Sequence, residues 1–121
     1  MSPRKILLVD DSALVRAVVA HALAAAGHEV ASVEDPGKID DAVAGGTPDL
    51  LLVDASYPGV TDDALVEVVS RHAARLPVVL FSDRPPCEVD ALASRIGARG
   101  SVPKDGATLA SRLAAFFSEA G

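Results

Sequence analysis

The stretch DLLLVD at residues 49–54 decides the fold of this chain. Four consecutive apolar residues follow Pro48 and Asp49 and precede a turn signal at residues 57–59, which is typical of a strand buried on both faces. The stretch ends in an acid, Asp54, which has no favourable place inside an apolar core. At the carboxyl end of a strand it is well placed, because ligands bind at that edge of an open α/β sheet. The residues that meet Asp54 at that edge therefore decide its role.

The composition describes one domain and restricts the classes of function. At 121 residues, 50% hydrophobic and 3% aromatic, the chain suits one domain over residues 1–121 with an aliphatic core. A net charge of −6 without a basic cluster argues against nucleic acid as a direct partner. No apolar run reaches the roughly 20 residues of a membrane helix, and one cysteine, Cys87, fits a reducing compartment. We expect a cytoplasmic protein without membrane insertion.

Strand and helix patterns alternate five times along the chain. Each strand pattern is short and apolar, and each is followed by apolar residues at helical spacing. The predicted strands are residues 5–10, 29–33, 49–54, 77–82 and 99–103. Gly27 and Gly97 are placed to end the first and fourth helices, because glycine adopts the left-handed conformation common after a helix.

This alternation predicts an α/β fold with a parallel sheet and helices on both faces. Pro103 has no backbone N–H for a neighbouring strand, which favours an edge position for the fifth strand. The flavodoxin-like doubly wound (βα)5 arrangement, with a five-stranded sheet in the order 2-1-3-4-5, meets this condition. It also makes strands one and three neighbours, so Asp10, Asp11 and Asp54 are expected to converge.

Three converging carboxylates require protons or a cation. Like charges about 4 Å apart repel by roughly 4 kcal/mol at an effective dielectric constant near 20, and all-oxygen ligands with open positions suit one Mg²⁺ ion completed by a phosphate. Ser82 ends the fourth strand and Lys104 follows the fifth, so a hydroxyl and an ammonium reach the same edge. A carboxylate there can attack a phosphoryl group while these groups offset its charge. Taken one at a time, these residues also have simpler interpretations: Asp11 as a helix cap, Ser82 as a turn residue and Lys104 as a surface cation.

At these positions the chain resembles the receiver domain of bacterial two-component response regulators, in the single-domain form of the chemotaxis regulators. The resemblance covers essentially the whole chain. It rests on Asp10-Asp11 after strand one, Asp54 after strand three with Pro58 four residues on, Ser82 after strand four, and Lys104 after strand five.

The resemblance implies that Asp54 accepts a phosphoryl group from a sensor histidine kinase or a phosphotransfer protein. It also implies one Mg²⁺ ion, held by Asp10, Asp11, Asp54 and the backbone carbonyl of Ser56. Such a domain is a signalling module and not a conventional enzyme, although it takes part in its own phosphorylation and dephosphorylation. Its output is expected to be a changed contact with another protein.

The resemblance further implies that Lys104 pairs with the phosphoryl group and that Ser82 is the switch hydroxyl. Two positions depart from the family's pattern. Ser101 stands three residues before Lys104, where receivers usually carry a Tyr or Phe whose ring couples the site to the surface. Asp83 follows Ser82, where a small residue is usual, and it either repels a phosphodonor or points to solvent.

Several functions are weighed at this point. The leading one is a stand-alone receiver that signals by binding another protein. In one form of this hypothesis, the domain only removes phosphoryl groups from a kinase. Because the sequence up to Gly121 contains no effector domain, we do not expect DNA output from the same chain. The alternative is a pseudo-receiver, a phosphorylation-independent interaction module, which Ser101 and Asp83 favour. A haloacid-dehalogenase-type phosphatase requires Asp-x-Asp, and a flavodoxin requires a Ser/Thr/Gly-rich loop; neither follows the first strand.

Overall fold

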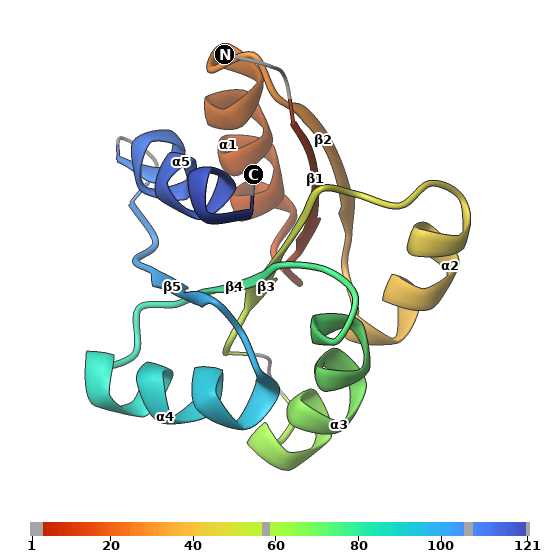
Figure 1. The fold of residues 1–121 in the computed structure, drawn as a ribbon, viewed down its shortest axis with the longest axis vertical. Helices are drawn as coiled ribbons and strands as arrows, with labels where there is room; N and C mark the ends of the chain where they lie inside the picture. The colour runs from red at the N-terminus through yellow and green to blue at the C-terminus, as the bar shows by residue number, and fades with distance from the viewer. Residues whose placement is uncertain (1–3, 57–58, 106–107, 121) are drawn as a thin grey trace.

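The chain folds around a five-stranded parallel sheet (Figure 1). The computed structural model describes residues 4–56, 59–105 and 108–120, so Pro58 of the receiver motif lies outside the described residues. The strands are β1 (Lys5–Val9), β2 (Glu29–Val33), β3 (Leu50–Asp54), β4 (Val78–Phe81) and β5 (Gly100–Val102). Their order is β2-β1-β3-β4-β5, which confirms the predicted α/β fold and strand order. Four of the five strands are one or two residues shorter than predicted, since strand ends lack regular pairing.

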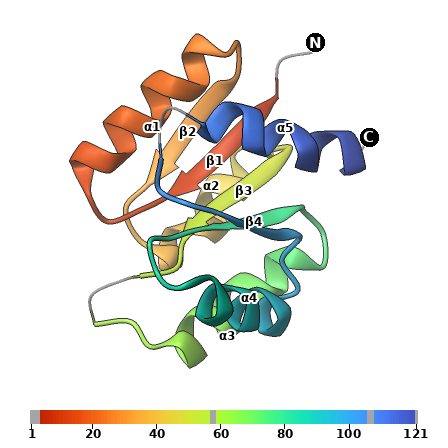
Figure 2. The same ribbon diagram turned by 90° about the vertical axis from the view of Figure 1, so that its left-hand side faces the viewer.

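Helices cover both faces of the sheet. The helices are α1 (Ala13–Ala25), α2 (Ile39–Ala44), α3 (Asp62–Ala73), α4 (Pro86–Ile96) and α5 (Leu109–Ala120). Figure 2 shows α1 and α5 together on one face, and α3 with α4 on the other. A short 3₁₀ turn over Pro36–Lys38 comes directly before α2.

The apolar run of β3 supplies both halves of the core. Successive side chains of a strand point to opposite faces of the sheet. Leu50 and Leu52 therefore pack in the cluster that includes residues of α1 and α5, whereas Leu51 and Val53 pack in the cluster that includes residues of α3 and α4. All four side chains are fully buried. This two-sided burial explains why the strand shows no alternation of apolar and polar residues.

The ends of the helices follow local sequence signals. Ser12 is the N-cap of α1 and accepts a hydrogen bond from the Val15 N–H at 3.3 Å. Thr61 caps α3 in the same way through the Ala64 N–H. Gly27 and Gly97 both adopt a positive φ after their helices, as predicted.

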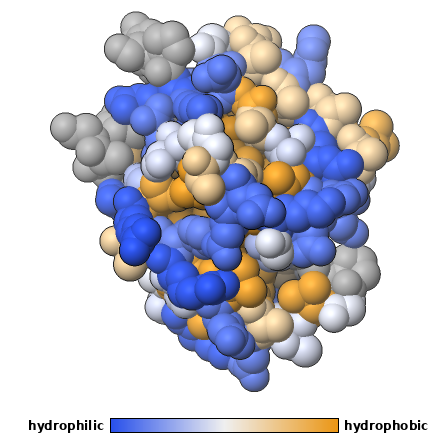
Figure 3. Space-filling model, turned by 90° about the vertical axis from the view of Figure 1, so that its right-hand side faces the viewer, coloured by the Kyte–Doolittle hydropathy of each residue, from blue (hydrophilic) through white to orange (hydrophobic). Residues whose placement is uncertain are grey.

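The outer surface beside α2 mixes polar and apolar residues. Figure 3 shows apolar residues on this face in separate patches between hydrophilic ones. Within the described residues, no helix is both long enough and apolar enough to cross a membrane.

Replacing Gly97 by alanine is expected to destabilise the fold by about 1–2 kcal/mol, because an L-residue is strained in the left-handed conformation. Gly97 has a φ of 86°. Gly45→Ala is the matched control, because Gly45 also ends a helix but has a φ of −78°. That variant is expected to gain about 0.4–1 kcal/mol through a less flexible unfolded chain. Urea unfolding measures both, and changes of the same sign would contradict the prediction.

Candidate functional site

The register of β1 and β3 brings two acids together at the carboxyl edge of the sheet. Leu8 lies opposite Leu52 in this parallel pair, and both strands end one or two residues later. Asp10 and Asp54 each follow these leucines by two residues. Because side chains alternate between faces, both carboxylates emerge on the face covered by α1 and α5. The alternation of side chains along the two strands therefore places the two acids next to each other.

Asp10, Asp11 and Asp54 form an acidic cluster at this edge. One carboxylate oxygen from each residue lies within 4.8 Å of the others. Asp10 is 0% and Asp54 is 1% exposed, whereas Asp11 is open to solvent. Among the described residues, the buried Asp10 Oδ2 finds no hydrogen-bond partner. An all-carboxylate set with one unsatisfied buried oxygen and one solvent-facing side fits Mg²⁺, which prefers oxygen ligands and retains water.

Lys104 supplies positive charge beside this cluster. Its ammonium lies 3.2 Å from Asp54 Oδ1 and 3.6 Å from Asp10 Oδ2. Its side chain is 20% exposed, and the ammonium sits 5.4 Å from the centre of the Phe81 ring. One ammonium offsets only part of the charge of three carboxylates, so a further cation remains favourable at the cluster.

Burial changes the acidity of the carboxyl group of Asp54. Loss of hydration raises the pKa of Asp54 above its ordinary value, because burial disfavours the charged form. The Ser56 N–H, which donates to Asp54 Oδ1 at 2.9 Å, and the Lys104 ammonium both oppose this rise in pKa. A cation at the cluster would act in the same direction as Lys104 and favour the ionised carboxylate.

Ser82 and Ser56 lie on the two loops next to Asp54. Ser82 is 5% exposed, and its hydroxyl oxygen lies 3.5 Å from that of Ser56. The Ser82 hydroxyl also accepts a hydrogen bond from the Arg84 N–H at 3.0 Å. The Ser82 hydroxyl, which the sequence predicts at this edge, thus contacts Ser56, whose N–H donates to the Asp54 carboxylate.

The two unusual positions have different surroundings. Ser101 is half-buried and lies opposite Leu80, whose side chain belongs to the cluster formed with α3 and α4. The small hydroxyl therefore occupies the α4 side of β5, where receivers usually carry a ring. Asp83 is exposed, which supports the interpretation that its carboxylate points to solvent.

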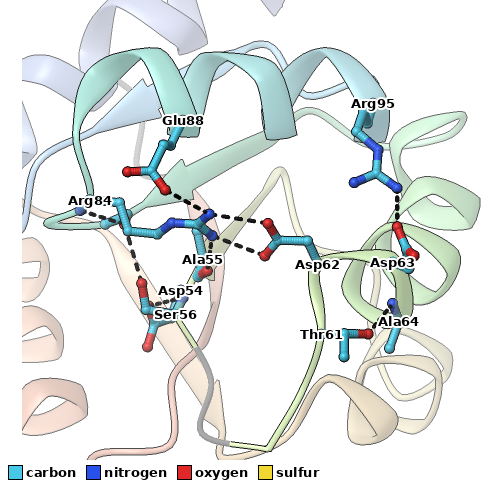
Figure 4. A network of polar contacts seen from close by, with 11 residues as sticks. Asp54, Ala55, Ser56, Thr61, Asp62, Asp63, Ala64, Arg84, Glu88 and Arg95 are labelled. Atoms are coloured by element: carbon cyan, nitrogen blue, oxygen red, sulfur yellow. Dashed lines mark hydrogen bonds and ion pairs between the residues drawn. The ribbon is translucent and has the colours of Figure 1, made fainter.

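Sequence reasoning missed Arg84 as part of this edge. Its guanidinium donates to the Ala55 carbonyl at 3.1 Å and to both carboxylate oxygens of Asp62, at 3.0 and 3.1 Å. It also reaches Glu88 at 3.4 Å (Figure 4). The available signal was opposite charge on the segments that follow two neighbouring strands, β3 and β4.

Comparison with known proteins identifies the class to which this fold and site belong. The family model of the response regulator receiver domain matches residues 6–114. The chain therefore belongs to the receiver domains of two-component response regulators, a family in which phosphorylation and Mg²⁺ binding at an acidic pocket are typical.

Individual relatives share this domain. The DNA-binding transcriptional regulator NtrC of Escherichia coli is 32% identical over 97 residues, which are 80% of this chain and 21% of that protein. The chain thus spans about a fifth of the length of that relative. The chemotaxis protein CheY4 of Vibrio cholerae is 26% identical with a TM-score of 0.80, over 93% of this chain and 97% of that one. A LuxR-family response regulator from Aurantimonas is 25% identical with a TM-score of 0.82, over 98% and 87%.

Mg²⁺ is expected to stabilise the protein, by about 2.7 kcal/mol at one hundred times its dissociation constant. Asp54→Asn is expected to be more stable than the wild type in the absence of divalent ions and to respond less to Mg²⁺. The reason is that the pKa of Asp54 is higher in the folded protein than its unfolded value of 3.8. The stability of the fold therefore decreases as the pH rises from 3.8 through the folded pKa, because the buried carboxyl group must ionise.

Thermal unfolding at neutral pH, with and without Mg²⁺, measures this difference. The matched control is Asp83→Asn, which removes an exposed acid outside the cluster and should keep the full response to Mg²⁺. An equal gain from Mg²⁺ in Asp54→Asn and Asp83→Asn would contradict binding at the acidic cluster.

Proposed function

We propose that this chain is a phosphoacceptor domain in which Asp54 takes a phosphoryl group from a histidine kinase or a phosphotransfer protein. The observation that carries the proposal is the surroundings of the Asp54 carboxylate. It is buried, shares a cluster with Asp10 and Asp11, and has the Lys104 ammonium at 3.2 Å. A nucleophile, metal ligands and a charge partner for the phosphoryl oxygens are thus available at one point.

Each side chain has a distinct part in the proposed transfer. A carboxylate oxygen of Asp54 forms the new bond to phosphorus, while the bond from phosphorus to the donor's nitrogen breaks and the donor histidine leaves. Mg²⁺, held by Asp10, Asp11, Asp54 and the Ser56 carbonyl, would neutralise charge on the acids and the phosphoryl oxygens. Lys104 adds a second positive charge at the same place.

The phosphoryl group would change the energy of the whole edge. It adds about −1.5 to −2 charge and can form one to three charge-assisted hydrogen bonds, each worth roughly 1.5–3 kcal/mol. A shift from 1:99 to 99:1 between two conformations requires about 5.5 kcal/mol. Two such bonds, donated by Ser82 and Lys104, approach this value.

The proposed output is a contact with another protein, made by a single receiver domain over residues 1–121. Support comes from the net charge of −6, which disfavours direct contact with nucleic acid. A cytoplasmic location follows from the proposed exchange with a kinase.

A second candidate function is a pseudo-receiver that binds a partner without phosphorylation. The specific observation in its favour is the small, half-buried Ser101 on the α4 side of β5. Because Ser101 is not aromatic, it lacks the ring that would couple a change at Asp54 to the surface of the domain. The acidic cluster and Lys104 favour the phosphoacceptor over this alternative.

Beryllofluoride, a mimic of the phosphoryl group, is expected to bind the wild-type protein only when Mg²⁺ is present. Fluorine NMR detects the bound species directly. Asp54→Asn is expected to abolish the signal, and Lys104→Met to weaken binding about tenfold or more, because a charge-assisted hydrogen bond is lost. Asp83→Ala is expected to bind as the wild type does, since Asp83 is exposed. Wild-type protein that shows no Mg²⁺-dependent binding would support the pseudo-receiver instead.

A further inference from the structure

Arg84 joins three separate elements next to the proposed phosphoryl site (Figure 4). Its guanidinium binds the Ala55 carbonyl after β3, Asp62 at the start of α3, and Glu88 in the first turn of α4. We call these contacts the Arg84 clamp. The bonds to the two Asp62 oxygens are paired and charge-assisted, which is the strongest geometry that an arginine offers a carboxylate.

The clamp closes a ring of contacts with the two serines of the site. The Arg84 N–H donates to the Ser82 hydroxyl at 3.0 Å, and this hydroxyl lies 3.5 Å from that of Ser56. Ser56 directly follows Ala55, whose carbonyl accepts from the Arg84 guanidinium at 3.1 Å. Starting from Ala55, the ring thus passes through Ser56, Ser82 and Arg84 and returns to Ala55. The two loops beside Asp54 are therefore fixed relative to each other.

The same contacts prepare the Ser82 hydroxyl for donation. A hydroxyl has one proton to donate and two lone pairs to accept hydrogen bonds. The Arg84 N–H uses one lone pair of Ser82, so the hydroxyl keeps its proton for donation, either to Ser56 Oγ at 3.5 Å or to a group bound at Asp54. Ser56 holds the nearby carboxylate of Asp54 through its own N–H, at 2.9 Å. A phosphoryl oxygen on Asp54 is an acceptor at this place.

A second arginine between the same helices provides a comparison. Arg95 of α4 pairs with Asp63 of α3, but these side chains are 49% and 86% exposed. The Arg84 side chain is 25% exposed and that of Asp62 is 44% exposed. Only the Arg84 pair is linked to the site, since its guanidinium also binds the carbonyl that follows Asp54.

We propose that Arg84 is a positioning residue for the phosphoryl site, which fixes the loop after β4 so that the Ser82 hydroxyl is in place before the phosphoryl group arrives. The inference rests on the proposed role of Asp54 as phosphoacceptor. Without the clamp, binding must order this loop, and each side chain ordered on binding costs about 0.5–1.5 kcal/mol. Loss of the clamp therefore weakens binding of a phosphoryl mimic by about two- to tenfold.

A double-mutant cycle with beryllofluoride and Mg²⁺ tests this inference. The dissociation constant of beryllofluoride is measured by fluorine NMR for the wild type, Arg84→Gln, Ser82→Ala and the double variant. Arg84→Gln is expected to weaken binding two- to tenfold in the wild-type background and to have no further effect once Ser82 is alanine. A purely structural role of Arg84 would give the same loss in both backgrounds.

Control variants separate the possible outcomes. Arg95→Gln removes the comparable exposed pair and is expected to leave the affinity unchanged. Asp62→Asn keeps the volume of the partner and weakens the clamp more gently, so it carries the test if Arg84→Gln does not fold. Unchanged affinity in both clamp variants, or an equal loss with and without the Ser82 hydroxyl, overturns the inference. Failure of the wild type to bind beryllofluoride overturns the proposed function, and the inference with it.

Discussion

The burial of two carboxylates beside one ammonium is the constraint on which the rest of this structure depends. Asp10 and Asp54 are almost completely removed from water, and Lys104 lies within 3.6 Å of both. Buried charges of the same sign are costly unless they are paired or bind a metal. The apolar side chains of the three central strands, β1, β3 and β4, are buried on both faces of the sheet and offset this cost. Such an arrangement is ready for a cation and for a further anionic group.

The geometry of the edge follows from the core. The leucines of β1 and β3 are in register, so the acids that follow them emerge side by side. Val102 of β5 packs in the same cluster as Leu8 and Leu52, and two residues later the chain brings Lys104 to the same edge. A shift of one residue in any of these strands would turn its polar group to the other face. Packing of the core and placement of the charges are therefore one constraint.

The sequence predicted the sheet order and the meeting of the three acids, because both depend on local patterns: alternation of strands and helices, and acids at strand ends. The contact of Arg84 with Asp62 escaped prediction, because it depends on the paths of two loops, which no periodicity describes. The 3₁₀ form of the turn over Pro36–Lys38 also escaped prediction, because proline fixes a φ that suits the first turn of either kind of helix.

The ring of contacts through Arg84 has a consequence for how this chain can diverge. Loops usually tolerate insertions and deletions, because few contacts fix their length. Here Arg84, in the loop after β4, contacts both ends of the loop after β3, at Ala55 and at Asp62. A residue gained or lost in either loop would separate the guanidinium from one of its acceptors. Among descendants of this sequence, both loops should therefore keep their present lengths wherever Arg84 is retained.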